Sequence, residues 1–417
     1  MENIATLAPT IKLTWLEKRY RDLVFSVFNK LQYGVLEIVE GDVHTFFPAG
    51  ATHNETNSNA NVQAPYGKII VHDASLFTDF VKGGSIGAAE AFIDGKWTSP
   101  DLTKVIQIFA RAQQQTDTIE QKKSWLSRVK NSLFHWQNRN SQKGSKRNIL
   151  AHYDLGNELY TRFLDPRMMY SSAIYPNEDA TLAQAQTHKL DLICQRLELT
   201  SDDHLLEIGT GWGGLAIYAA KHYGCKVTTT TISDAQHAYA QQQIAQQGLT
   251  NQITLLKKDY RELTGSFDKL VSIEMIEAVG FEYLPSFFQQ CNDRLKDGGK
   301  LLIQSITIAD QRFEYYKNNV DFIQRYIFPG GFLPSINVLS QHITTHSSLV
   351  IEEMHDIGLD YARTLADWRQ AFLNSWPELN ELGYDEQFKR LWLYYLGYCE
   401  GAFLERSTST VHLIARK

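Results

Sequence analysis

The sequence predicts an α/β protein in which a doubly wound, Rossmann-like domain follows a smaller N-terminal α/β domain. Three observations predict this fold class. The chain of 417 residues exceeds the roughly 250–300 residues at which one hydrophobic core stops growing. Helical and strand-like patterns alternate from residue 148 onwards, and an early strand-like run of that part breaks into closely spaced glycines. We therefore expect a small domain over 1–115, a basic linker over 116–147 and a second domain over 148–417.

In the N-terminal part, strand patterns precede helical patterns. Residues 33–39 and 67–72 are apolar and rich in β-branched side chains, and a polar loop joins them. A helix is expected over 86–93, after two glycines and a serine. Another is expected from 102 towards 111, because a serine followed by proline precedes it in the order that opens helices.

The linker combines basic charge with an apolar stripe. Between residues 121 and 147 the chain has eight lysines and arginines and no acidic residue. Trp125, Val129, Leu133 and Trp136 recur at helical spacing, which suits a helix lying on an anionic membrane surface. Packing of this stripe on the adjoining domain is an equally good interpretation. One short basic band in a chain of net charge −6 argues against nucleic acid as a partner.

The second domain is predicted to hold a mainly parallel sheet. Its expected strands cover 205–208, 226–232, 253–257, 269–273, 300–308 and 412–415. Ligands of doubly wound sheets bind outside the carboxyl ends of the strands. We therefore expect the functional residues in the segments that follow these strands.

The run 205–214 is a predicted strand that ends in the turn Gly209-Thr210-Gly211-Trp212-Gly213. Bare glycine backbone before a helix lets a ligand approach the helix N-terminus. A tight turn in another kind of α/β protein is the alternative interpretation. Isoleucine and serine, at 232 and 233, stand where a dinucleotide site would have an acidic residue, so the pattern disfavours NAD and suits S-adenosylmethionine better.

Composition argues against several other classes of protein. The four cysteines lie far apart without a paired spacing, which argues against a metal site and fits a reducing cytoplasm. The first 18 residues lack a signal-peptide pattern, and no run of about 18 apolar residues predicts a membrane-spanning helix.

Several motifs together resemble the cyclopropane fatty acid synthases and their mycolic-acid-modifying relatives, which are S-adenosylmethionine-dependent methyltransferases. They lie at 83–97, 152–157, 169–172, 205–214, 231–236, 272–280, 326–331 and 394–403. The resemblance implies a class I methyltransferase domain and a small domain associated with lipid. It implies methyl transfer to the cis double bond of a phospholipid acyl chain, followed by ring closure. It also implies a cytoplasmic protein that visits the inner face of the membrane, and it leaves a homodimer open.

Three alternatives stay open beside cyclopropane formation. The same lipids could receive a methylene or methyl branch. A methyltransferase acting on a small molecule is the second alternative. A lipid-binding protein without catalysis is the third.

For catalysis, the resemblance implies a bound bicarbonate as the base that removes a proton before ring closure. The family's glutamate and tyrosine correspond to Glu277 and Tyr326. Its cysteine and histidine are replaced by Ser172 and Gln304, which still donate hydrogen bonds but cannot carry imidazolium charge. The anion should therefore bind more weakly or differently. Cys399 matches a further family cysteine near the site, or it is a buried apolar thiol.

The resemblance also implies a set of cofactor residues. They are Tyr170 and Ser171 for the methionine portion, Gly209 and Gly211 beside it, Thr231 and Gln236 around the ribose, Tyr260 and Arg261 near adenine, and Glu207, which orders the glycine loop or meets the amino group.

The segment 313–332 contains seven aromatic residues. An alkene is a weak nucleophile, and the intermediate of its methylation resembles a carbocation. Aromatic faces attract a cation without attacking it. These rings therefore suit the reaction, although lining a fatty-chain tunnel or a core is the alternative role.

Overall fold

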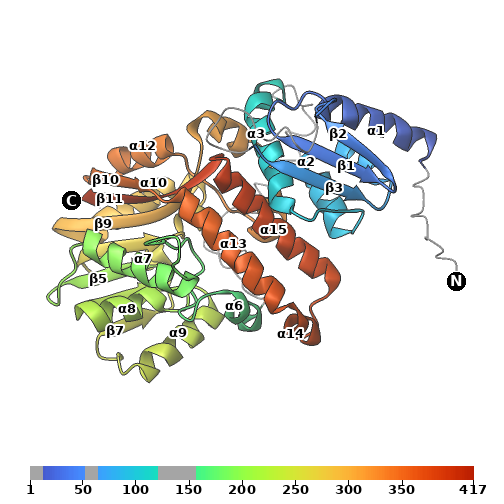
Figure 1. The fold of residues 1–417 in the computed structure, drawn as a ribbon. Coiled ribbons are helices and arrows are strands. Elements are labelled where there is room, and N and C mark those ends of the chain that lie inside the picture. Colours follow the sequence, from blue (N-terminus) through green and yellow to red (C-terminus); the bar gives the residue numbers. More distant parts are fainter. Residues whose placement is uncertain (1–12, 52–63, 121–155) are drawn as a thin grey trace. The chain divides into compact units, whose positions relative to one another are not determined.

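The computed structural model describes residues 13–51, 64–120 and 156–417, which belong to two compact units (Figure 1). One unit comprises Met1–Lys122 with Trp376–Ser407, and the other comprises Lys123–Ser375 with Thr408–Lys417. This division differs from the contiguous one expected from the sequence, since a C-terminal segment belongs to the N-terminal unit. The apolar stripe expected between Trp125 and Trp136 lies outside the described residues.

The N-terminal unit is built on a four-stranded sheet with the order β2-β1-β3-β4. Its strands are β1 (Val35–Glu40), β2 (Val43–Phe47), β3 (Tyr66–Val71) and β4 (Trp97–Thr98), and its helices are α1 (Trp15–Phe28), α2 (Leu76–Ile93), α3 (Leu102–Glu120), α14 (Trp376–Glu381) and α15 (Glu386–Leu404). The strands predicted over 33–39 and 67–72 are confirmed as β1 and β3. The sequence analysis missed α1, although Thr14 and Glu17 form a capping box at its start.

Helix α15 belongs to this unit because it packs closely on α2 and α3. A Cβ atom on Gly401 would lie 2.8 Å from the Ile106 side chain, so α3 and α15 approach where glycine leaves room. The Thr103 hydroxyl donates to buried Glu400 at 3.0 Å. Sequence proximity to the last strand therefore misassigned this helix.

The C-terminal unit contains a seven-stranded sheet with the order β10-β11-β9-β8-β5-β6-β7. Its strands are β5 (His204–Ile208), β6 (Lys226–Thr230), β7 (Ile253–Leu256), β8 (Phe267–Ile273), β9 (Leu295–Ile308), β10 (Val350–Asp356) and β11 (Thr408–Arg416). The five strands β5 to β9 are parallel, and β11 pairs antiparallel with β9 and β10. All six strands predicted for this domain are present, and the doubly wound class is confirmed.

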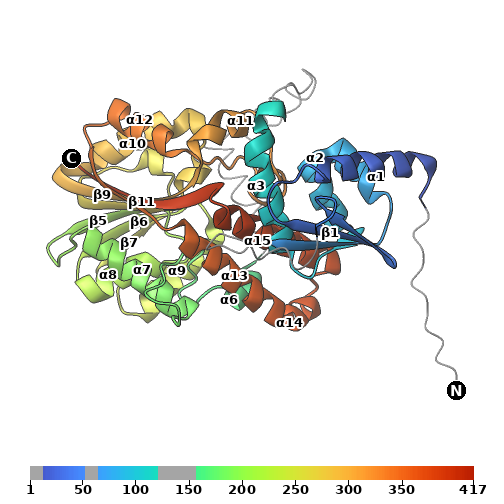
Figure 2. The ribbon, with the colours of Figure 1, turned by 45° about the horizontal axis from the view of Figure 1, so that its top comes forward.

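Helices cover both faces of this sheet (Figures 1 and 2). They are α6 (Asn157–Phe163), α7 (Leu182–Arg196), α8 (Gly214–Tyr223), α9 (Asp234–Gln246), α10 (Leu284–Arg294), α11 (Phe313–Lys317), α12 (Ile336–His346) and α13 (Gly358–Asn374), with short turns η2 (Tyr260–Glu262), η3 (Ile276–Ala278), η4 (Phe281–Tyr283), η5 (Asp310–Arg312) and η6 (Ile323–Ile327). Two apolar cores result. Side chains of α7, α8 and α9 form one core, and side chains of α10 and α12 form the other.

The strand order reverses between β5 and β8. From β5 the chain continues to β6 and β7 on one side, and it then returns to β8 and β9 on the other. At such a point the segments that follow the two strands diverge, and ligands bind there. The glycine turn follows β5, and Glu274 follows β8 directly, so the fold brings these two segments together at the binding edge.

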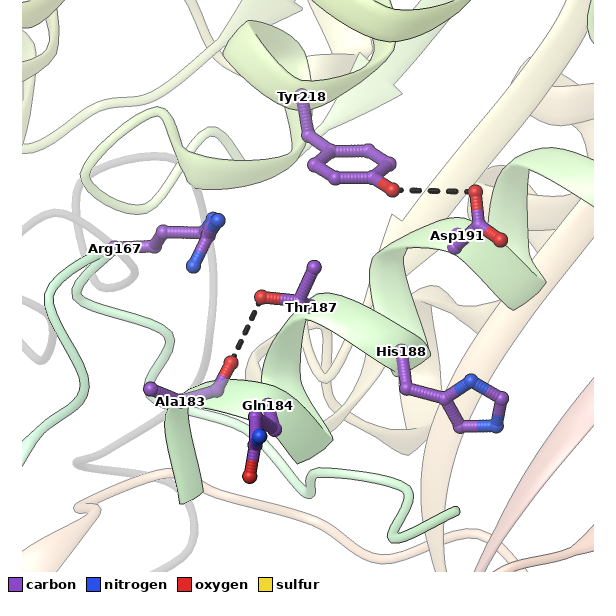
Figure 3. Close-up of a pocket in the computed structure, with 7 residues that line it drawn as sticks. All are labelled: Arg167, Ala183, Gln184, Thr187, His188, Asp191 and Tyr218. Atoms are coloured by element: carbon purple, nitrogen blue, oxygen red, sulfur yellow. Dashed lines mark hydrogen bonds between the residues drawn. The ribbon is translucent and has the colours of Figure 1, made fainter. Parts of the chain in front are cut away.

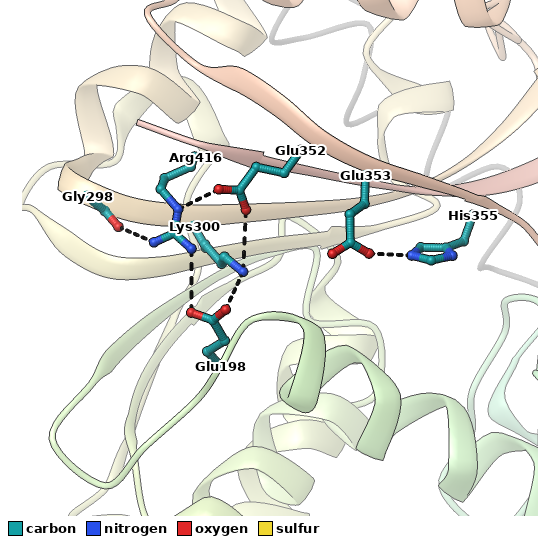
Figure 4. Close-up of polar contacts among 7 residues, drawn as sticks. All are labelled: Glu198, Gly298, Lys300, Glu352, Glu353, His355 and Arg416. Atoms are coloured by element: carbon teal, nitrogen blue, oxygen red, sulfur yellow. Dashed lines mark hydrogen bonds and ion pairs between the residues drawn. The ribbon is translucent and has the colours of Figure 1, made fainter.

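Strand β10 was not predicted because it is a polar edge strand with an irregular exposure pattern. Ion pairs tie it to the sheet (Figure 4). Glu352 accepts from the Arg416 Nε at 2.6 Å and lies 3.4 Å from the Lys300 Nζ, which also contacts Glu198 at 2.6 Å. Only 5% of Lys300 is exposed, so this network anchors the edge where apolar contacts are few.

Candidate functional site

The glycine turn begins immediately after β5 and leads into α8. Gly209, Gly211 and Gly213 have φ values of 101°, 53° and 93°, which L side chains rarely adopt. A Cβ atom on Gly211 would meet nothing within 4 Å, whereas one on Gly209 would lie 3.2 Å from Met275. The backbone at Gly211 therefore faces open space, as a ligand-cradling turn requires.

Glu207 supports this turn from beneath. Its side chain accepts a hydrogen bond from the Thr229 hydroxyl at 2.5 Å, and Thr229 in turn bonds to Thr210 in the turn. Burial raises the pKa of Glu207 to about 8, with the Thr229 hydrogen bond opposing it. With only 2% of the residue exposed, the arrangement matches the first of the two predicted roles, ordering the loop.

Four further predicted cofactor residues follow β6 and β7. Thr231 and Gln236 are buried, and the Thr231 hydroxyl donates to the Gln236 Oε1 at 2.9 Å. Arg261 makes a bidentate contact with the Asp259 carboxylate, in which both nitrogen-to-oxygen distances are 2.7 Å. The Arg261 guanidinium also lies over the ring of Tyr260. Because β5, β6 and β7 are neighbours in register, these residues and the glycine turn form one row along the sheet edge.

Tyr170 and Ser171 lie in the segment between α6 and α7. The partly exposed ring of Tyr170 packs between the rings of Tyr160, Trp368 and Phe328, with centroid distances of 5.2, 5.3 and 6.4 Å. The Ser171 hydroxyl accepts from the Lys189 Nζ at 2.7 Å. Burial lowers the pKa of Lys189 to about 8, while the Coulombic influence of Glu274 and Asp165 opposes this.

Glu274 is the centre of the polar cluster after β8. Its Oε1 accepts from the Ser172 backbone N–H at 2.9 Å and from the Gln304 Nε2 at 2.7 Å. Its Oε2 accepts from the Tyr361 hydroxyl at 2.8 Å. The two residues expected to hold bicarbonate, Ser172 and Gln304, therefore direct these donors at a carboxylate of the protein.

A chain of hydrogen bonds fixes the orientation of the Gln304 amide. An arginine can only donate, so Arg196, whose NH1 is 2.6 Å from the Nδ1 of His412, makes that nitrogen an acceptor. The other ring nitrogen then carries the proton and donates to the Gln304 Oε1 at 2.8 Å. Burial and the nearby Arg196 charge hold the pKa of His412 well below its usual value, so the ring is neutral. The Gln304 Nε2 is consequently aimed at Glu274.

Glu277 lies one turn further along, on η3. Its Oε1 accepts from the Ile306 N–H at 2.6 Å, while its buried Oε2 has no hydrogen-bond partner among the described residues. Burial, with the nearby Glu274 charge, raises the pKa of Glu277 to about 8. Glu277 is therefore the member of the pair that holds a proton at neutral pH, whereas the three donors to Glu274 favour the charged form of that carboxyl.

The other two predicted catalytic residues are on different elements. Tyr326 is on η6, is 37% exposed, and contacts Phe322 and Arg325. Cys399 is on α15 in the N-terminal unit. Of the seven rings between 313 and 332, Phe313, Phe322 and Phe332 are buried, as expected for core residues. The roles of Tyr326 and Cys399 stay predictions.

The sequence analysis missed Lys189, Tyr361 and His412, and it included Glu274 only within the motif at 272–280. A signal existed for Lys189. It lies on the same face of α7 as the buried Ala185, Gln186 and Ile193, where an apolar residue is expected. No local pattern marks Tyr361 or His412, because tertiary contacts alone bring them to the strand ends.

Figure 3 shows a separate pocket, lined by residues of α7, α8 and the preceding segment. In it the Tyr218 hydroxyl donates to Asp191 at 3.1 Å, and the Thr187 hydroxyl donates to the Ala183 carbonyl at 2.8 Å. None of the predicted site residues lines this pocket. Within the described ranges, no group of three or more His, Cys, Asp or Glu residues is arranged to hold a metal ion. Over the same ranges, the search for a helix of membrane-spanning length and hydropathy finds none.

Comparison with known proteins identifies the family. A family model described as mycolic acid cyclopropane synthetase matches residues 140–413. The cyclopropane-fatty-acyl-phospholipid synthase of Escherichia coli K12 is 38% identical over 339 residues, which is 81% of this chain and 85% of the relative. Tuberculostearic acid methyltransferase UfaA1 of Mycobacterium tuberculosis is 35% identical over 327 residues, 77% and 76% of the two chains.

Solved structures agree with this relationship. The cyclopropane synthase MmaA2 from Mycobacterium tuberculosis superposes with a TM-score of 0.61 at 27% identity, covering 65% of this chain and 98% of MmaA2. The mycolic acid cyclopropane synthase CmaA1, solved with SAH and CTAB, gives 0.60 at 28% identity over the same shares. This chain therefore belongs to the mycolic acid cyclopropane synthetase family and is an S-adenosylmethionine-dependent methyltransferase with the class I fold.

Proposed function

We propose that this enzyme transfers the methyl group of S-adenosylmethionine to the cis double bond of an unsaturated phospholipid acyl chain and closes a cyclopropane ring. The observation that carries the proposal is the carboxylate pair, Glu274 and Glu277, at the switch point beside the glycine turn. The substrate class follows the Escherichia coli relative, which its name describes as acting on fatty-acyl phospholipids.

The residues after β5, β6 and β7 fit the cofactor. The open space over Gly211 accommodates a ligand against bare backbone, and the buried pair Thr231 and Gln236 offers neutral polar groups suited to ribose hydroxyls. When bound, S-adenosylmethionine supplies an electrophilic methyl group, which the alkene π electrons attack while the sulfur keeps the electron pair of the broken S–C bond. We assign Tyr170 and Ser171 to the methionine portion, and Tyr260 and Arg261 to the adenine side.

The surroundings of Tyr170 suit a cationic intermediate on the lipid. Its ring and that of Phe328 are partly exposed and lie against each other, and an aromatic face attracts a cation without attacking it, while buried Trp368 supports the Tyr170 ring from within. Excluding water matters equally, because a stray water molecule would capture the cation. This aromatic cluster supports carbon methylation of a lipid over methylation of a soluble amine.

A methylene or methyl-branched product on the same lipids is the second candidate. The specific observation that favours it is Gln304, which replaces the histidine expected from the family resemblance and uses both ends of its amide within the protein. Two relatives of similar identity also have names that give different products, so family membership leaves the product open.

Product analysis tests the proposal. The purified enzyme is incubated with S-adenosylmethionine and vesicles of a monounsaturated phospholipid, and the acyl chains are examined by mass spectrometry and NMR. We expect a mass gain of one CH2 group with loss of the olefinic protons and the appearance of cyclopropane protons. Retained olefinic protons would indicate a methylene product, and transfer only to soluble amines would contradict the proposal.

We also propose that the enzyme reaches its substrate by peripheral contact with the inner face of the membrane. Moving an acyl chain into water costs about 0.8 kcal/mol per CH2 group, so the chain must pass from bilayer to protein directly. Helix α1 is suited to such contact (Figure 1). Trp15, Leu16, Leu23 and Val27 are 71, 45, 50 and 54% exposed and share about one third of the helix circumference, with Arg19 over the Trp15 ring.

Vesicle sedimentation tests this contact. The double variant Leu23→Ser, Val27→Ser removes exposed apolar area while leaving buried Val24 and Phe28 in place. We expect it to weaken binding to anionic vesicles several-fold. Leu382→Ser, at a residue 50% exposed outside α1, is the matched control and should bind as the wild type does. Equal binding of all three proteins would contradict a role for α1.

A further inference from the structure

We propose that Glu274 is the base of the ring-closing step, a carboxylate of the protein itself acting where the family resemblance implies a bound bicarbonate. The inference rests on the proposed function. It makes the enzyme independent of bicarbonate and assigns Tyr361 and Gln304 as positioning residues for the Glu274 carboxylate.

The first argument is geometric. Three donors from separate parts of the unit converge on this one carboxylate: the Ser172 N–H before α7, the Gln304 amide on β9 and the Tyr361 hydroxyl on α13. Ser172 is fully buried, and its hydroxyl donates to the Ala173 carbonyl at 2.9 Å. The donors that would grip an external anion are therefore already used by the protein.

The second argument comes from the backbone. Glu274 has φ 46°, a left-handed conformation that is unfavourable for a non-glycine residue and persists only where the surroundings hold it. Its own N–H donates to the Gln304 carbonyl at 2.8 Å, so β9 fixes both ends of the residue. A glutamate in a conformation that favours glycine, held by four hydrogen bonds at the switch point, indicates a functional constraint.

The third argument is electrostatic. Burial raises the pKa of Glu274, while the Ser172, Gln304 and Tyr361 hydrogen bonds and the Lys189 charge oppose this rise. A carboxylate that stays ionised but has a raised pKa is a stronger base than one in water. Glu277, the other acidic group facing it, holds a proton at neutral pH, and His412 behind Gln304 is neutral. Three donors and the Lys189 charge therefore favour the charged form of Glu274, whereas the contacts of Glu277 among the described residues include a single donor, the Ile306 N–H.

The proposed step balances. After methyl transfer, one ring carbon bears the new CH3 group and its neighbour is cationic. A Glu274 oxygen takes a proton from that CH3 group, and the electron pair of the broken C–H bond forms the third C–C bond of the ring. The carboxylate becomes a carboxylic acid and then releases its proton to solvent, which restores the starting state. No oxidant, reductant or further co-reactant is needed.

The test compares Glu274→Gln and Glu274→Gly with a matched control. Glutamine keeps the size of the side chain, and its amide oxygen can still accept from the Ser172 N–H and the Gln304 amide, but it cannot take a proton from carbon. Glycine suits φ 46° and leaves space for a small anion. Glu198→Gly is the control, because Glu198 also has a left-handed backbone, φ 55°, and lies outside the site. Thermal unfolding checks that all three variants fold.

We expect both Glu274 variants to lose about 10²- to 10⁴-fold in turnover, and Glu198→Gly to keep wild-type turnover. Wild-type turnover should be equal in bicarbonate-free and bicarbonate-supplemented buffer. A second readout does not require turnover: ¹³C-bicarbonate NMR should detect no binding to the wild type and binding to Glu274→Gly.

Two results would overturn the inference. One is wild-type turnover that depends on added bicarbonate, together with ¹³C-bicarbonate binding to the wild type. The other is Glu274→Gln with wild-type turnover. If instead the wild type modifies no unsaturated phospholipid, the proposed function fails, and the bicarbonate-binding measurement still decides whether Glu274 fills the anion site.

Discussion

Two glutamates near the ends of neighbouring strands differ in almost every respect except burial of the carboxyl group. Glu207, in β5, has one hydroxyl donor, ordinary strand backbone and 2% exposure. Glu274, directly after β8, has three donors, a left-handed backbone and a partly exposed residue surface. Burial is the largest influence on the pKa of both carboxyls and raises it.

The difference shows how one sheet edge provides both a support and a reactive group. Glu207 has a single neutral donor, the Thr229 hydroxyl, and is protonated at neutral pH. Through Thr229 it supports Thr210 in the glycine turn. At Glu274, three donors and the nearby Lys189 charge oppose the rise of the pKa that burial causes, so they favour the charged form. The number of donors around a buried carboxyl, more than its depth, decides which chemistry it can perform.

Among the variants that test this difference between Glu274 and Glu207, we expect the largest effect from Tyr361→Phe. It removes the hydroxyl that donates to the Glu274 Oε2. A hydrogen bond to a charged group contributes about 1.5–3 kcal/mol, so turnover should fall roughly 10- to 100-fold. The ionised form also loses support, so the pKa of Glu274 rises and the acid limb of the pH–kcat profile moves to higher pH. Steady-state kinetics from pH 5 to pH 9 measures both changes.

Tyr175→Phe is the matched control for that variant. The Tyr175 hydroxyl donates to Asp367 at 2.7 Å, so this substitution removes the same group from a carboxylate outside the cluster. It should leave the pH profile unchanged. An equal loss in both variants, without a shift of the acid limb, would reduce Tyr361 to a structural role.

A smaller effect is expected from Glu277→Gln. At pH 7 the amide replaces a protonated carboxyl, so turnover should stay within several-fold of wild type. Above pH 8 the wild-type Glu277 loses its proton beside the Glu274 charge, and activity should fall. The variant cannot ionise there and should keep its activity to higher pH. An alkaline limb that is unchanged in Glu277→Gln would assign it to Lys189, whose pKa is also about 8.

The sequence predicted this half of the molecule unevenly. The parallel strands and the glycine turn were predictable, because β-branched runs and glycine spacing are local signals, whereas the roles of the cofactor residues stay predictions. Edge strand β10 was missed because its exposure does not alternate and because Glu352, Glu353 and His355 make it polar. Figure 4 shows that Glu352 meets Lys300 and Arg416, which are far from it in sequence, whereas Glu353 pairs with His355 two residues away.

The site was predictable only where motifs are continuous. Glu277 was found from its motif, and Ser172 and Gln304 were found as departures from the family. Their actual partner, Glu274, could not be recognised, because its role depends on Tyr361, 87 residues away, and on a backbone conformation that sequence does not reveal. Tyr326 was chosen by motif, and its role stays a prediction, whereas the Tyr361 hydroxyl on α13, which donates to Glu274, has no motif that marks it.

The smallest effect is expected from Glu207→Gln, which tests the other side of the comparison. If Glu207 is protonated and only supports the turn, its neutral amide replacement should bind S-adenosylmethionine with an affinity within a few-fold of the wild type at pH 7. Calorimetry measures this affinity. The folded pKa, about 8, lies above the unfolded value, so the wild type binds an extra proton when folded and its stability falls as pH rises from about 5 to 8. The variant lacks this titration. The Tm difference between the two proteins should therefore move in favour of Glu207→Gln as pH rises, and a constant difference would mean that Glu207 is ionised in the folded enzyme.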